Sequence, residues 1–166
     1  MKANEMWNKY IKNIEDKTYM GDEAAVYDAA TYDAASCDVA TYDAWAFGAD
    51  ADKLAQLVLS GKKTATSSAY PIYELEGEEL PKAEEYSVIL DSKDEAVCII
   101  KTTRVYIIPF NRVSEQHAYL EGEGDRTLEY WRNVHRDFFT EELREVGLEF
   151  TEEMLVVCEE FEVVYK

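Results

Sequence analysis

The densest polar cluster in the sequence could bind an anion or another polar ligand. It directly follows Gly61 and consists of Lys62, Lys63, Thr64, Thr66, Ser67 and Ser68. A phosphate-binding P-loop is excluded, because that motif needs a glycine where Gln56 stands and a Ser or Thr where Lys63 stands. In an acidic chain, two lysines beside four hydroxyls are the best candidates for a polar-ligand site. A solvated strand end explains the same composition equally well.

A second cluster, residues 121–125, has the sequence Glu-Gly-Glu-Gly-Asp and could supply a general acid or base. Its two glycines allow tight turns that crowd the carboxylates, and crowding raises carboxyl pKa values. The simpler interpretation is a lead-in to a helix that Asp125 caps.

The helix expected after this cluster places an aromatic, a cation and a histidine at neighbouring positions. Trp131, Arg132 and His135 lie at helical spacing, and Trp131 with His135 could stack on a base or sugar, although such residues are more often core. His117 and His135 are the only histidines, so neither a catalytic triad nor a zinc site is expected. The three cysteines, Cys37, Cys98 and Cys158, are expected to be reduced core residues.

The charge balance restricts the partners of the chain. Seventeen basic and thirty-five acidic residues give 17 − 35 = −18, a field that repels phosphate backbones, so non-specific nucleic-acid binding is not expected. No apolar run approaches the ~18 residues of a membrane span, and the first residues lack the apolar core of a signal peptide. A soluble, cytoplasmic protein without a membrane partner is therefore expected.

Hydrophobic periodicity and breakers predict the elements that position these clusters. Helices are expected at 3–18, from Asp50 or Asp52 to Gly61, at 113–120 and from Asp125 to 146. Strands are expected at 63–70, with Pro71 marking the strand's end as an edge or turn, at 86–90, 96–107 and 154–165. Without regular βαβ alternation, this order indicates an α+β fold with a small, mainly antiparallel sheet or barrel and packed helices.

An unusual five-residue pattern, Tyr-Asp-Ala-Ala-Thr and variants, runs from Tyr27 to Trp45. Period five fits neither a helix nor a strand, so we interpret it as an expanded loop that could be shortened at little cost in stability. It separates an N-terminal helix and low-complexity segment, residues 1–41, from a main domain, residues 42–166.

Several motifs together resemble the ASCH domain family, in particular its longer bacterial members. Residues 61–66 resemble its signature Gly-x-Lys-x-x-Ser/Thr, residues 42–48 resemble the lead-in, and residues 121–125 with Trp131, Arg132 and His135 follow in the same order. The resemblance implies a PUA-like β-barrel with helices. It also implies that RNA or a nucleotide binds in a cleft beside the signature.

Small bacterial members similar at the signature hydrolyse the amide of N4-acetylcytidine with a Lys, a Thr and a Glu. The resemblance carries these roles to Lys63, Thr66 and Glu121, with Glu123 as the alternative acid; no cofactor or metal is implied. A neutral Lys63 would be the base that activates Thr66 as a nucleophile. A charged Lys63 would instead hold an oxyanion, with Glu121 as the general base toward Thr66 or water. Further candidates for ligand binding are Trp45, Lys62, Ser67, Glu123, Trp131, Arg132 and His135.

The resemblance, taken with these residues, implies two functions. The first is hydrolysis of an N-acyl amide on a nucleoside-like ligand, and the second is non-catalytic binding of RNA or a nucleotide. We expect Lys63 and Thr66 to line the largest polar pocket, with Glu121 or Glu123 opposite.

Overall fold

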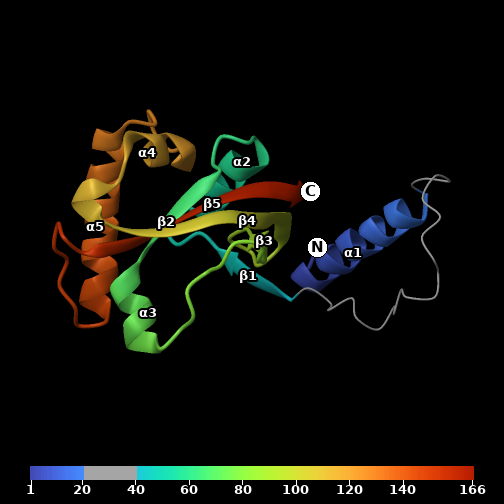
Figure 1. The fold of residues 1–166 in the computed structure, drawn as a ribbon, viewed down its shortest axis with the longest axis horizontal. Helices are drawn as coiled ribbons and strands as arrows, with labels where there is room; N and C mark the ends of the chain where they lie inside the picture. Colours follow the sequence, from blue (N-terminus) through green and yellow to red (C-terminus); the bar gives the residue numbers. More distant parts are fainter. Residues whose placement is uncertain (21–40) are drawn as a thin grey trace, which may run out of the picture.

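The computed structural model describes residues 1–20 and 41–166 (Figure 1). The five-residue pattern from Tyr27 to Val39 and Cys37 lie outside the described residues. The elements in chain order are α1 (Ala3–Met20), β1 (Tyr42–Ala46), α2 (Ala51–Leu59), β2 (Ala65–Ala69), α3 (Tyr70–Glu76), β3 (Tyr86–Leu90), β4 (Ala96–Pro109), the 3₁₀ turn η1 (Phe110–Arg112), α4 (Glu115–Glu121), α5 (Leu128–Glu145) and β5 (Leu155–Tyr165). No helix among the described residues is both long and apolar enough to cross a membrane.

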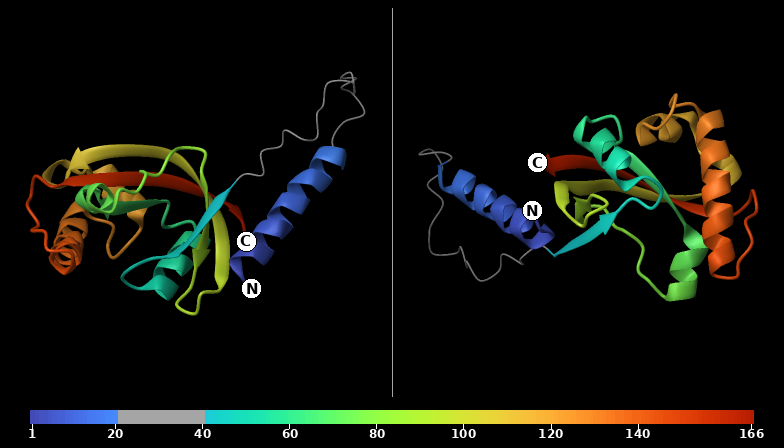
Figure 2. Two further views of the ribbon diagram at one scale, coloured as in Figure 1. Left: turned by 90° about the horizontal axis from the view of Figure 1, so that it is seen from below. Right: turned by 180° about the vertical axis from the view of Figure 1, so that it is seen from behind.

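One curved, mixed sheet of five strands organises the α+β fold, with the order β1-β3-β4-β5-β2. Only β1 and β3 pair in parallel; the other neighbours are antiparallel, as the sequence predicts. Strands β4 and β5 sweep across the whole sheet (Figure 2), and their register shifts between Thr102 and Arg104. Such a bulge increases local twist and helps to bend the sheet toward a barrel. Helices α4 and α5 lie at one end of the sheet and α1 lies at the other (Figure 1).

Local signals in the sequence identified most of these elements. The β3–β4 hairpin turns at residues 91–95, where the Asp91 N–H donates to the Glu95 carbonyl. Asp50 caps α2 by accepting from the Lys53 N–H, and Gly61 takes a left-handed backbone with φ of 73°. The stretches at 113–120 and 154–165 form α4 and β5, within a few residues of the expected boundaries.

Three expectations need correction. Pro71 does not simply end a strand: it lies in the first turn of α3, where its missing N–H costs nothing. The α5 helix is capped by Thr127, whose hydroxyl accepts from the Tyr130 N–H, while the Asp125 carboxylate accepts from Thr127. Residues 42–46 form the edge strand β1, because a partner distant in sequence, β3, supplies the backbone hydrogen bonds.

The core has three apolar clusters around the sheet. One joins α1 to β3 and β4, where Met6, Trp7 and Tyr10 pack against Val88 and Ile99. A second fills the space between α2 and the sheet, and a third lies under α5. Cys98 and Cys158 are buried and free, as expected for core residues. The α2 and α5 clusters lie on the two sides of the candidate site.

Candidate functional site

The corner between α2 and β2 positions the lysine of the signature. The chain leaves α2 through Gly61, and the N–H groups of Lys62 and Lys63 both donate to the Leu57 carbonyl. The Thr64 N–H then donates to the Leu120 carbonyl at 2.8 Å, which ties the start of β2 to the end of α4. The backbone thereby turns the Lys63 side chain inward, where 1% of its surface is exposed.

The glycines of residues 121–125 let the carboxylates approach this lysine. Gly122 ends α4 with φ of 74°, and a Cβ added there would lie 2.2 Å from the Lys62 carbonyl oxygen. A Cβ on Gly124 would lie 2.4 Å from the Tyr130 ring. Only glycine fits these close approaches, so the two positions fix the path of the loop.

Lys63 bridges two carboxylates. Its Nζ donates to Glu121 Oε2 and to Glu123 Oε1, both at 2.8 Å, and it lies 5.2 Å from the centre of the Phe47 ring. Burial lowers the pKa of Lys63, but attraction to Glu121 and Glu123 outweighs burial and holds that pKa above its ordinary value. The lysine is therefore a cation at neutral pH.

Glu121 is enclosed by donors on both oxygens. Its Oε1 accepts from Ser67 Oγ at 2.6 Å and from Trp131 Nε1 at 2.9 Å, while Oε2 accepts from Lys63. Burial raises the pKa of Glu121, but the interactions with Lys63, His135 and His117 lower it by more. The net pKa therefore lies well below its usual range. A carboxylate so stabilised is a weak base, so Glu121 is suited to holding Lys63 rather than to accepting a proton.

The hydrogen bonds of His117 exclude a serine–histidine nucleophile pair. Ser67 gives its single proton to Glu121, so His117 Nε2–H must donate to Ser67 Oγ, 2.8 Å away. His117 Nδ1 then accepts from the Tyr106 hydroxyl at 3.1 Å. In this arrangement His117 has no vacant nitrogen with which to deprotonate Ser67.

His135 is held by the helix that carries it. Its ring stacks on Trp131 with centroids 4.2 Å apart and planes inclined by 16°. Nδ1–H donates to the Trp131 carbonyl at 2.9 Å, which leaves Nε2 facing Glu121 Oε1 at 3.5 Å. These groups do not form a metal centre: within residues 1–20 and 41–166, no set of three or more His, Cys, Asp and Glu residues is arranged to hold a metal ion.

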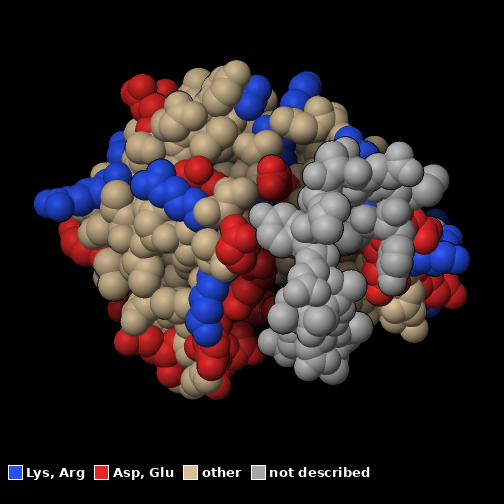
Figure 3. Space-filling view, turned by 45° about the vertical axis from the view of Figure 1, so that its right-hand side comes forward, with Lys and Arg blue, Asp and Glu red and all other residues tan. Residues whose placement is uncertain are grey.

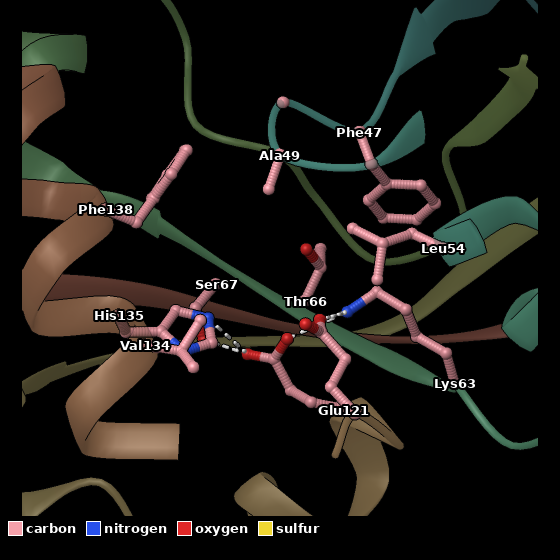
Figure 4. Close-up of a pocket in the computed structure, with 12 residues that line it drawn as sticks. Phe47, Ala49, Leu54, Lys63, Thr66, Ser67, Glu121, Val134, His135 and Phe138 are labelled. Carbon is pink, nitrogen blue, oxygen red and sulfur yellow. Dashed lines mark hydrogen bonds and ion pairs between the residues drawn. The ribbon is translucent and has the colours of Figure 1, made fainter. Parts of the chain in front are cut away.

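A cavity of about 80 Å³, which we call the Lys63 pocket, opens above these groups (Figure 4). Six of the ten predicted site residues line it. Its lining is Phe47, Gly48, Ala49, Leu54, Lys63, Thr66, Ser67, Glu121, Glu123, Val134, His135 and Phe138. The Thr66 side chain makes no hydrogen bond within the described residues, so its hydroxyl is available to a ligand. The expectation of the largest pocket is wrong, because hollows of about 690 and 720 Å³ lie elsewhere on the described surface.

Four residues expected to bind ligand lie outside this pocket. Lys62 is exposed, and Arg132 donates to the Asn111 carbonyl. Trp131 is 2% exposed and acts through its bond to Glu121, and Trp45 lines an adjoining hollow. The helical spacing allowed Trp131 either to stack on a ligand or to pack in the core, and the structure shows core packing.

The sequence assigns no site role to two apolar walls, Phe47 and Phe138, or to the buried polar link from His117 to Tyr106. The spacing of four between His117 and Glu121 on one helix was the available signal for that link. Nothing in the local pattern marks Phe138 as facing the site, because an apolar residue in a helix fits a core equally well.

Comparisons with known proteins agree with the fold. The fold is an α+β fold of the PUA-like class. A model of the ASCH domain matches residues 43–165, and the chain therefore belongs to the ASCH domain family. No curated protein sequence matches the chain significantly.

Solved structures show the same relationship. An ASCH domain from Lactobacillus crispatus JV V101 is 40% identical with a TM-score of 0.73, over 76% of this chain and 81% of that one. Protein EF3133 from Enterococcus faecalis V583 is 39% identical with a TM-score of 0.73, over 97% of this chain and 89% of that one. A third, the hypothetical protein PH0355, is 17% identical over 75% of this chain and all of its own, with a TM-score of 0.53, and shares the fold alone.

Proposed function

We propose that the Lys63 pocket binds a small nucleoside-like ligand and hydrolyses an N-acyl amide of it. The observation that carries this proposal is a buried ammonium group held at the pocket wall by two carboxylates, beside an unpartnered hydroxyl, Thr66. A pocket of about 80 Å³ is large enough for an acyl group and its amide, while the rest of the ligand lies in the adjoining space.

The surroundings of Lys63 favour its role as a charged group over its role as a base. Its raised pKa keeps the proton on Nζ, so the ammonium can hold the amide carbonyl oxygen and the negative charge that develops on it. Because Glu121 and Glu123 fix Nζ before a ligand arrives, little reorganisation is needed during the reaction. In this proposal Thr66, which lines the same pocket, donates a second hydrogen bond to that oxygen.

Glu123 is the better acid–base group of the two glutamates. It is 19% exposed, against 2% for Glu121, and its Oε2 makes no hydrogen bond within the described residues. In the proposed step Glu123 takes a proton from water, and the water oxygen bonds to the acyl carbon while the carbonyl electrons move to oxygen. The C–N bond then breaks, and Glu123 returns the proton to the leaving amine nitrogen.

The charge of the molecule favours a small ligand without phosphates over an RNA strand. The formal net charge is −18, and two of the groups at the pocket are carboxylates. Binding a strand would require several phosphates to be neutralised by Lys or Arg. The lysine nearest the pocket already has two carboxylate partners.

The test is release of acetate from N4-acetylcytidine by the purified protein and by two variants. We expect Glu123→Gln to lose at least about a hundredfold in kcat. Thr66→Val should lose a similar factor, because one donor to the oxyanion disappears.

The matched control is Glu129→Gln, which neutralises an exposed carboxylate in the first turn of α5 and should leave turnover unchanged. Thermal melts of all variants verify folding. Binding of N4-acetylcytidine by calorimetry without turnover would overturn the hydrolase and favour the non-catalytic binding module.

A further inference from the structure

An acidic groove leads away from the Lys63 pocket along the same face of the molecule. A hollow of about 340 Å³ shares Phe47, Gly48, Thr66, Ser67 and Phe138 with the pocket. It continues into the hollow of about 690 Å³, with which it shares Trp45, Tyr73, Pro81 and Glu159. We call these two hollows together the acidic groove. A ligand held at Thr66 thus has open space toward Glu159.

The lining of the groove carries one sign of charge. Its acidic side chains are Asp43, Glu78, Glu79, Glu85, Glu142 and Glu159, and no Lys or Arg of the described residues lines either hollow. Lys82, outside the lining, pairs with Glu79 alone. Figure 3 shows acidic side chains gathered along the middle of one face of the molecule. Carboxylates focused in a concave surface attract cations and repel phosphates.

Glu159 is the second and independent sign of a ligand. It is nine-tenths buried, yet it lines both hollows of the groove. One oxygen, Oε1, accepts from the Thr102 hydroxyl, and the other has no partner within the described residues. Burial raises the pKa of Glu159, and no cation opposes that effect. A buried carboxylate without a counter-charge is costly unless a ligand supplies one.

Glu142 is a further carboxylate in the smaller hollow of the groove. Its Oε2 is shielded from solvent and has no hydrogen-bond partner in the part of the chain that the structure describes. Burial, followed by repulsion from Glu145 and Glu76, raises the pKa of Glu142. The rings of Trp45 and Tyr73 line the same space, and aromatic faces attract ammonium and guanidinium groups.

We propose that the acidic groove binds a protonated amine or guanidinium group, with its charge at Glu159 and Glu142 and its carbon chain against Trp45 and Tyr73. This inference rests in part on the proposed function, since it makes the ligand of the Lys63 pocket a molecule with a cationic extension. The binding of the cation itself does not require hydrolysis.

The probe is 1,5-diaminopentane, which carries two ammonium groups, and its neutral control is 1,5-pentanediol. Trp45 lines both hollows, so its fluorescence reports binding, and calorimetry measures the affinity. We expect the diamine to bind and the diol not to bind. Glu159→Gln keeps an oxygen for Thr102 but removes the charge, and it should weaken diamine binding at least about tenfold. Glu142→Gln should act in the same direction.

Glu129→Gln removes the same charge from an exposed site that lines a different hollow. Equal weakening by Glu129→Gln and Glu159→Gln would overturn the proposal, because the diamine would then respond to net charge alone. Failure of the diamine to bind would overturn it as well. If Glu159→Gln does not fold, Glu142→Gln with a Tyr73→Leu variant carries the same comparison.

The outcome is separable from the proposed function. Acetate release from N4-acetylcytidine without diamine binding would overturn the proposal of cation binding in the groove and support the proposed hydrolysis. Diamine binding at Glu159 without acetate release would support the proposal of cation binding and count against the proposed hydrolysis.

Discussion

Glu121 and Glu159 are two buried glutamates whose surroundings differ in kind. Glu121 receives hydrogen bonds from Lys63, Ser67 and Trp131, and its pKa lies well below the usual range. Glu159 receives one hydrogen bond, from Thr102, and its pKa is raised. The protein itself compensates the first charge and leaves the second to be compensated from outside.

This difference separates a preorganised site from a receptive one. In the Lys63 pocket, the ammonium of Lys63 and the carboxylate of Glu121 are paired before a ligand arrives, which fixes the cation where negative charge develops. In the acidic groove, unpaired oxygens and aromatic walls remain, which suits binding of a positive charge. The two regions share Thr66 and Phe138, so one molecule could occupy both.

Removing the internal cation should produce the largest effect. Lys63→Met leaves Glu121 buried without its counter-charge, and we expect the free energy of unfolding to fall by about 3–5 kcal/mol in urea titrations. The double variant Lys63→Met with Glu121→Gln should recover part of this loss, because the stranded charge is gone. A loss below about 1 kcal/mol in the single variant, the size typical of surface pairs, would show that solvent already compensates Glu121.

Neutralising Glu121 and neutralising Glu159 should change the free energy of unfolding in opposite directions. Both oxygens of Glu121 accept hydrogen bonds, so in Glu121→Gln the amide NH₂ must face a donor in either orientation. We expect a loss of about 2–3 kcal/mol at pH 7. Because the folded-state pKa of Glu121 is depressed, its contribution is complete above its ordinary value of 4.5 and is lost as pH falls. The difference between variant and wild type should therefore shrink in melts below pH 4.5; a constant difference would contradict the assignment.

The smallest effect should have the opposite sign. In Glu159→Gln the amide oxygen still accepts from Thr102, and the NH₂ occupies the unpartnered place, so stability should rise by about 1 kcal/mol or less. The folded-state pKa of Glu159 is raised, so the wild type loses stability as pH rises from 4.5 through that pKa. The advantage of the variant should be present at pH 7 and absent near pH 4.5. A fall in stability at pH 7 would mean that Glu159 is compensated within the protein.

Local pattern was sufficient for most of the fold. Hydrophobic spacing predicted α1, α2 and α5, and alternation with a polar turn predicted the β3–β4 hairpin. The strand β1 could not be identified in this way, because its parallel partner β3 begins about forty residues later and pairing at that distance leaves no local signal. Likewise, Pro71 is equally compatible with the end of a strand and the first turn of a helix.

The sequence by itself determined which residue types could meet. It has a lysine after a helix that ends at a glycine, and two glutamates separated by a glycine, the residue that adopts a left-handed turn most readily. Tertiary structure decided their states. The spacing of Glu121 and Glu123 left open whether they would crowd together or cap a helix, and the folded chain places Lys63 between them. Whether a carboxylate accepts a proton or holds a cation depends on its donors and its burial. The donors to Glu121 and Glu159 include side chains of α5, β2 and β4, elements that only folding brings together.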